Sequence, residues 1–70
     1  MEYKYTRFEN KHDPILEGLP SRERKHLVSL SRRCDWLLSK IGNSEADDFY
    51  REERSATLWA INFIMEKLKG

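Results

Sequence analysis

The sequence predicts an all-α fold: an antiparallel two-helix hairpin preceded by an extended N-terminal arm and one short helical turn. Apolar residues recur every three or four positions through residues 21–42 and again through residues 44–69, which is the period of an α-helix. About three residues around Gly42 separate the two segments, so the helices must pack side by side in opposite directions. The 70 residues suffice for a single domain, 1–70, which we expect to assemble into a helical oligomer.

The arm and the short turn are predicted over residues 1–20, which show no helical period. Asp13 followed by Pro14 is typical of an N-cap and the first residue of a helix, and Gly18 should end that helix after about one turn. The arm is expected to lie on the helices through its aromatic residues. These anchors are Tyr3, Tyr5 and Phe8.

The first long helix is predicted over residues 21–42, with Ser21 as its N-cap and Gly42 as a left-handed C-cap. Its apolar stripe consists of Leu27, Leu30, Cys34, Leu37 and Ile41. Cys34 is therefore interpreted as a small core residue. As the only cysteine it can form no intrachain disulfide, and we expect the protein in the reducing cytoplasm.

The second long helix is predicted over residues 44–69, and Ser44 with Asp47 resembles a capping box. The face expected to pack against the first helix is formed by small and large apolar residues. They are Ala46, Phe49, Ala56, Ala60, Phe63 and Ile64. These positions lie within about one side of a helical wheel drawn at about 100° per residue.

Four apolar residues of the second helix are left outside that face, and they form the predicted self-association interface. They are Leu58, Trp59, Ile61 and Met65. A helix that is apolar on several sides is usually buried on several sides, so we expect a homo-oligomer. The alternative is that the arm and the turn at residues 13–19 fold back and cover them. Asn62 would be either exposed or a buried hydrogen bond that fixes register.

A basic face is predicted on the first helix around Trp36. It comprises Arg22, Lys25, Arg32, Arg33 and Lys40. Arginines can hold phosphate oxygens and an indole can stack on a base, so this face suits an anionic ligand such as a nucleotide. Two alternatives stay open: a contact with a partner protein, or a solvated face on which the arm covers Trp36.

Charge and motif content limit the classes of function. The net charge of +1 gives no global attraction to nucleic acid, although residues 22–40 hold six basic against two acidic side chains. His12, His26 and Cys34 are too far apart to suggest a catalytic or metal site, and no phosphate-binding glycine loop is present. We therefore expect no enzyme, no cofactor, no bound metal and no membrane segment.

The segment Arg51–Ile61 resembles the closing helix of short phage-encoded proteins, in which a charged turn leads into an Ala/Leu-Trp-Ala-aliphatic run. The hairpin pattern over residues 22–68 is also similar. One branch of such proteins, resembled through Trp59 and Ala60, is the anti-CBASS cyclic-nucleotide sponges, which are helical oligomers that sequester signalling nucleotides. The resemblance implies a small accessory or host-takeover factor that occupies a host or viral partner protein. The alternatives are an oligomer that sequesters a small anionic ligand and a nucleic-acid-binding module.

Overall fold

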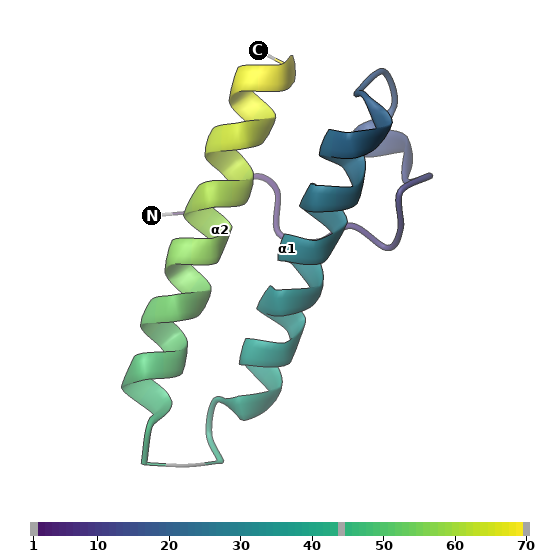
Figure 1. The fold of residues 1–70 in the computed structure, drawn as a ribbon. Coiled ribbons are helices and arrows are strands. Elements are labelled where there is room, and N and C mark those ends of the chain that lie inside the picture. The colour runs from purple at the N-terminus through teal and green to yellow at the C-terminus, as the bar shows by residue number, and fades with distance from the viewer. Residues whose placement is uncertain (1, 44, 70) are drawn as a thin grey trace.

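The fold is a two-helix hairpin crossed by the N-terminal arm (Figure 1). A computed structural model describes residues 2–43 and 45–69. Its elements are a 3₁₀ helix η1 (Pro14–Leu16) and two α-helices, α1 (Ser21–Lys40) and α2 (Asp47–Lys69). No strand is present among the described residues, so the predicted all-α class is confirmed.

Helix α1 buries Leu27, Cys34 and Leu37 of the predicted stripe, whereas Leu30 and Ile41 are half-buried. It differs from the prediction at both ends. Ser21 is the first helical residue and not the N-cap, a position that Pro20 occupies without a side-chain hydrogen bond. The helix ends at Lys40, and Ile41 is the C-cap in extended conformation. Gly42 then turns the chain with a φ of +88°, the left-handed conformation that was expected of it.

Helix α2 begins at Asp47, three residues later than predicted, and Ser44 lies outside the described residues. The Asp47 carboxylate accepts a hydrogen bond of 2.9 Å from the backbone N–H of Gly42, across the loop. Asp47 and Asp48 occupy the first turn of α2, where the helix dipole favours negative charge. Asp47 therefore ties the start of α2 to the end of α1.

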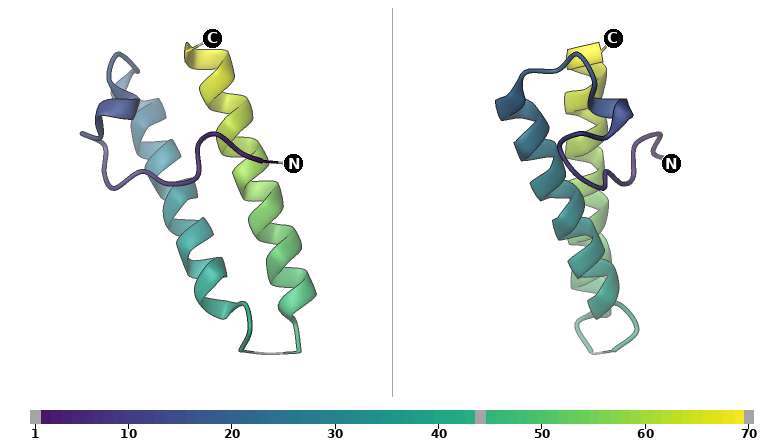
Figure 2. Two further views of the ribbon diagram at one scale, coloured as in Figure 1. Left: turned by 180° about the vertical axis from the view of Figure 1, so that it is seen from behind. Right: turned by 90° about the vertical axis from the view of Figure 1, so that its right-hand side faces the viewer.

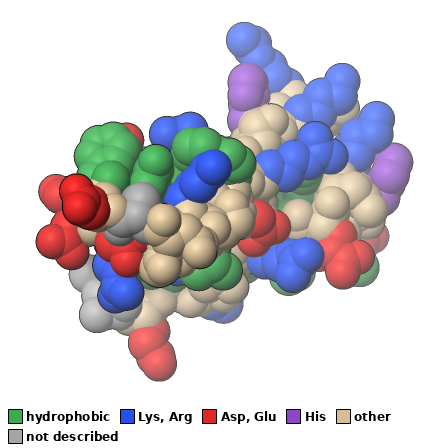
Figure 3. Space-filling model, turned by 90° about the horizontal axis from the view of Figure 1, so that it is seen from below, with side chains coloured by type: hydrophobic (Ala, Val, Ile, Leu, Met, Phe, Trp, Pro, Cys, Tyr) green, Lys and Arg blue, Asp and Glu red, His purple; other side chains and the backbone are tan. Residues whose placement is uncertain are grey.

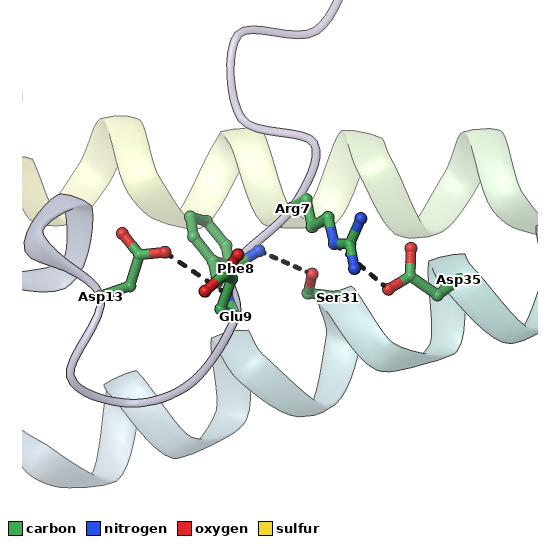
Figure 4. A network of polar contacts seen from close by, with 6 residues as sticks. All are labelled: Arg7, Phe8, Glu9, Asp13, Ser31 and Asp35. Atoms are coloured by element: carbon green, nitrogen blue, oxygen red, sulfur yellow. Dashed lines mark hydrogen bonds and ion pairs between the residues drawn. The ribbon is translucent and has the colours of Figure 1, made fainter.

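The arm runs across both helices on one side of the hairpin, as the view from behind shows (Figure 2). Phe8 enters the core and is 3% exposed, while its backbone N–H donates to Ser31 Oγ at 2.9 Å (Figure 4). On α2, the backbone N–H and C=O of Tyr5 both bond to the side chain of Asn62. Tyr3 and Tyr5 pack against the core from outside, so the predicted anchors of the arm are confirmed.

The turn at η1 is built by side chains that bond to nearby backbone. Asp13 is the predicted N-cap, and one oxygen of its carboxylate accepts from the backbone N–H of Ile15 at 3.0 Å. Its second oxygen accepts from the backbone N–H of Glu9 at 3.3 Å (Figure 4). Gly18 ends the segment with a φ of +87°. The turn delivers the fully buried Leu16 to one end of the hairpin.

The core lies between α1, the inner side of α2, the arm and η1. Its members are Phe8, Leu16, Leu19, Leu27, Val28, Cys34, Leu58, Ile61 and Met65. Leu58, Ile61 and Met65 are thus buried within the chain, which corrects the expectation that they need cover from outside it. The arm and η1 supply that cover, as in the alternative weighed above.

The predicted inner face of α2 points the other way. Phe49 and Phe63 are 59% and 50% exposed, and Ala56 is also exposed. Ile64 alone among the large residues of that face packs against the core. The molecule measures 41 × 22 × 15 Å, and residues 2–43 and 45–69 include no third α-helix that could lie over this side of α2. The outer faces of α1 and α2 are therefore the surfaces available for function.

Candidate functional site

The outer face of α1 is basic along its length. The predicted residues Arg22, Lys25, Arg32, Arg33, Trp36 and Lys40 are all exposed there. This face lies opposite the buried stripe of Leu27 and Cys34, so helix packing leaves it to solvent. Figure 3 shows basic side chains and histidines gathered on one side of the molecule.

The structure divides these residues into two groups. Lys25 and Arg32 line a hollow of about 410 Å³ together with Val28 and Ser29 of α1 and Lys11 of the arm, and we call it the basic hollow. Arg33 and Lys40 instead lie beside Trp36. Arg22 is exposed on the same helix but does not line the basic hollow.

The cations of the basic hollow have no acidic neighbours along its wall. Among the described residues, Lys11, Lys25 and Arg32 form no ion pair. The ion pairs found in the described part of the chain involve other side chains. The Arg33 guanidinium lies 3.9 Å from the Glu53 carboxylate, and the Arg7 guanidinium lies 3.7 Å from the Asp35 carboxylate. Three like charges on one concave surface repel one another, so an anion bound there would lower their electrostatic free energy.

Trp36 is 48% exposed, and the arm does not cover it. Its ring meets the edge of Tyr50 from α2, with centroids 6.1 Å apart and ring planes at 88°. Arg33 and Lys40 lie over the indole at 5.7 and 5.5 Å from its centroid. The expected alternative in which Tyr3, Tyr5 or Phe8 covers Trp36 is therefore wrong, because those residues pack on the core.

A second hollow, of about 470 Å³, was not expected from the sequence. Its walls are Tyr3, Leu38, Ile41, Arg51, Arg54, Ser55 and Leu58. The three-residue spacing of Arg51 and Arg54 places both guanidinium groups on one side of α2, which was the available signal. This spacing could not predict the hollow, because the wall opposite Arg51 and Arg54 comes from the arm and from the end of α1.

The outer side of α2 carries an apolar stripe, which we call the outer stripe. It consists of the exposed residues Phe49, Ala56, Trp59 and Phe63 and the half-buried Ala60. Trp59 is 55% exposed and stacks on Phe63 with centroids 5.3 Å apart and planes at 18°. Of the four predicted interface residues, Trp59 alone remains on the surface.

The remaining chemistry of the chain is sparse. Cys34 is buried, and burial raises the pKa of its thiol, which the nearby charge of Arg54 partly opposes. Within residues 2–43 and 45–69, no group of His, Cys, Asp and Glu side chains is placed to hold a metal ion. None of the described helices combines the length and the apolar composition that crossing a bilayer requires.

No family model matches this chain, and comparisons with curated proteins and with solved structures also gave no match. The resemblance of Arg51–Ile61 to short phage-encoded proteins therefore stays a prediction.

Proposed function

We propose that this protein is a non-enzymatic binding protein that captures a small phosphate-bearing ligand, such as a nucleotide, in the basic hollow. The observation that carries the proposal is the convergence of Lys11, Lys25 and Arg32, from two elements of the fold, on one hollow without an acidic partner. Arg32 offers a fork of donors for phosphate oxygens, and the lysines add point charges. The Ser29 hydroxyl adds a neutral donor.

The size of the hollow favours a small ligand over a nucleic acid. At about 410 Å³ it falls within the range of roughly 300–1,000 Å³ typical of small-molecule sites. A surface that follows a nucleic-acid backbone needs a larger basic excess than a chain of net charge +1 provides. The nucleic-acid function stays an alternative outcome of the test.

Trp36 would extend the site from phosphate recognition to base recognition. It lies one turn beyond Arg32 on the same face, about 6 Å along the helix axis, which is comparable to the separation of base and phosphate within a nucleotide. A base that stacks on the indole would displace Arg33 or Lys40 from the ring, and both are exposed side chains that can move.

Thermal stabilisation by ligands tests the proposal. The purified protein is heated with inorganic phosphate, mononucleotides or cyclic dinucleotides at millimolar concentration. A ligand present at 100 times its Kd stabilises the fold by about 2.7 kcal/mol, which is a shift of roughly 10 °C or more in Tm for a domain of this size. Absence of any shift with all of these compounds would refute the proposal.

Two matched variants locate the site. Arg32→Glu should abolish the shift, whereas Arg51→Glu makes the same charge change in the second hollow and should preserve it. Trp36→Ala should weaken the binding of nucleotides but leave the binding of inorganic phosphate unchanged. If Arg51→Glu abolishes binding and Arg32→Glu does not, the ligand occupies the second hollow and the proposed site is wrong.

The partner-protein function expected from the sequence is tested separately. A pull-down from host lysate, compared between the wild-type protein and Arg32→Glu, would recover an acidic protein that uses the same face. Affinity for DNA or RNA that falls steeply with salt would instead support the nucleic-acid alternative.

A further inference from the structure

The second hollow combines an apolar wall with two cations. Arg51 and Arg54 lie one turn apart on α2, so both guanidinium groups belong to the same side of that helix. The volume of about 470 Å³ falls within the range of roughly 300–1,000 Å³ typical of small-molecule sites. The apolar wall comes from the arm, the end of α1 and the buried side of α2. Its members are Tyr3, Leu38, Ile41 and Leu58.

Arg54 is half-buried in this wall, and its guanidinium group has no acceptor among the described residues. Its Nε is buried without a hydrogen-bond partner, and the side chain forms no ion pair there. A charged group that loses water on folding normally gains an acceptor, because an unsatisfied buried donor costs free energy. Arg24 also has a buried Nε without a partner, but it lines neither this hollow nor the basic hollow. Arg54 therefore offers unused donors beside a hollow that can admit a ligand.

The nearby acidic side chains do not neutralise Arg54. None of the described lining residues of the second hollow is acidic. Asp47 and Asp48 precede Arg51 by one turn on α2, so at that spacing they offset charge on Arg51 and not on Arg54. The Asp47 carboxylate also accepts from the backbone of the loop. Other carboxylates of this region lie elsewhere: Asp35 pairs with Arg7, Glu53 pairs with Arg33, and Glu52 and Glu53 line a different hollow with Phe49 and Ala56.

We propose that the second hollow binds an organic carboxylate with an apolar body, such as a medium-chain aliphatic acid. The guanidinium of Arg54 presents a fork of donors that matches the two oxygens of a carboxylate, and the Ser55 hydroxyl adds a neutral donor. The alkyl chain lies against the apolar wall and leaves water. One dominant cation favours a monoanion.

This ligand class differs from the one proposed for the basic hollow. There, Val28 is the one apolar residue among the described lining residues, so an alkyl chain gains little. In the second hollow, inorganic phosphate has no apolar part to place against the wall. The two sites thus select different anions, and the inference does not depend on the proposed function.

Titration of ¹⁵N-labelled protein with octanoate, followed by NMR near neutral pH, tests the site. Octanoate at millimolar concentration should produce a saturable shift of the Arg54 Nε–H signal. Butyrate keeps the carboxylate but has four fewer methylenes, and it should bind at least about tenfold more weakly, since each fully buried methylene contributes about fourfold in affinity. Octan-1-ol keeps the chain but lacks the charge, and it should also bind at least about tenfold more weakly. No saturable shift with octanoate, or equal affinity for octanoate and either control compound, would overturn the proposal.

Two variants of the second hollow and one matched control locate the ligand. Arg54→Met keeps an apolar stem without the guanidinium and should weaken octanoate binding at least about tenfold. Arg32→Met makes the same change in the basic hollow and should leave octanoate binding unchanged while it abolishes nucleotide binding, so failures of the two proposals can be told apart. Leu38→Ser removes an exposed part of the apolar wall and should weaken octanoate binding at least about threefold with little effect on butyrate.

Circular dichroism checks that each variant keeps its helices. Leu38 is 52% exposed, so Leu38→Ser decides the question even if Arg54→Met does not fold. Unchanged octanoate affinity in a folded Arg54→Met or in Leu38→Ser would refute the site. Loss of octanoate binding in Arg32→Met would place the carboxylate in the basic hollow and would also refute it.

Discussion

The carboxamide of Asn62 holds the backbone of Tyr5 through both of its polar atoms. Its Nδ2 donates to the carbonyl oxygen of Tyr5 at 2.7 Å, and its Oδ1 accepts from the N–H of Tyr5 at 2.8 Å. The second hydrogen of Nδ2 goes to the carbonyl oxygen of Leu58 at 2.8 Å. The side chain thus offers the arm the donor and acceptor that a neighbouring strand would offer, which explains how an extended segment is held without a sheet.

Replacing Asn62 by Ala should loosen the arm. The change leaves the N–H and C=O of Tyr5 without their partner, and we expect a loss of about 1–3 kcal/mol in the free energy of unfolding, measured by urea denaturation. Ser55→Ala is the control, because it removes only the exposed contact of 3.4 Å with the Tyr3 hydroxyl and should cost under about 0.5 kcal/mol. Equal stability of the Asn62→Ala variant and the wild type would show that the arm is not held at this point.

Phe8 and Phe49 provide a matched pair for the core. Phe8→Ala empties a buried site of the arm and should cost about 3–5 kcal/mol of unfolding free energy. Phe49→Ala removes the same side chain from an exposed position and should change stability by under about 1 kcal/mol. Similar losses in both variants, measured in urea at low protein concentration, would contradict the described core.

Leu58 and Trp59 are neighbours in sequence with opposite environments. Leu58→Glu places a charge in the core and should unfold the chain, which circular dichroism would detect as loss of helical signal. Trp59→Glu should keep that signal, because Trp59 is exposed. A folded Leu58→Glu variant that merely dissociates would restore the interface expected from the sequence.

Cys34 should make stability depend on alkaline pH. Burial raises the pKa of its thiol in the folded chain, whereas the unfolded thiol ionises near pH 8.5. The unfolded state therefore loses its proton first, and the free energy of unfolding should fall as the pH rises above about 8.5. Cys34→Ala lacks this term, so its stability difference from the wild type should shrink between pH 8 and pH 10. A constant difference would contradict the raised pKa.

Periodicity predicted the inner side of α1 but not that of α2. Along α1, charged residues occupy the side opposite Leu27 and Cys34, so only one side can be buried. In α2, the run from Leu58 to Met65 is apolar on nearly every side of the helix. Helical periodicity therefore allows two different sides of α2 to pack against the core. The arm selects between them: Asn62 binds Tyr5, which turns Leu58 inwards and Phe63 outwards.

The sequence predicted only those residues of the candidate site that lie on a single helix, α1. The face of Lys25, Arg32 and Trp36 follows from helical spacing alone. Lys11 could not be added to it, because its position depends on the path of the arm after Phe8. The second hollow was missed for the same reason, since Tyr3 lines it together with Arg54 only because the arm folds across the helices.

The Tyr5–Asn62 contact joins residues 57 positions apart, which has a kinetic consequence. The α1–α2 hairpin closes through a loop of a few residues and can form early, whereas docking of the arm closes nearly the whole chain and should come late. Interactions formed after the transition state change the unfolding rate more than the folding rate. In stopped-flow experiments, Asn62→Ala should therefore increase the unfolding rate and leave the refolding rate nearly unchanged. Docking of the arm would then determine how long the folded chain persists before it unfolds.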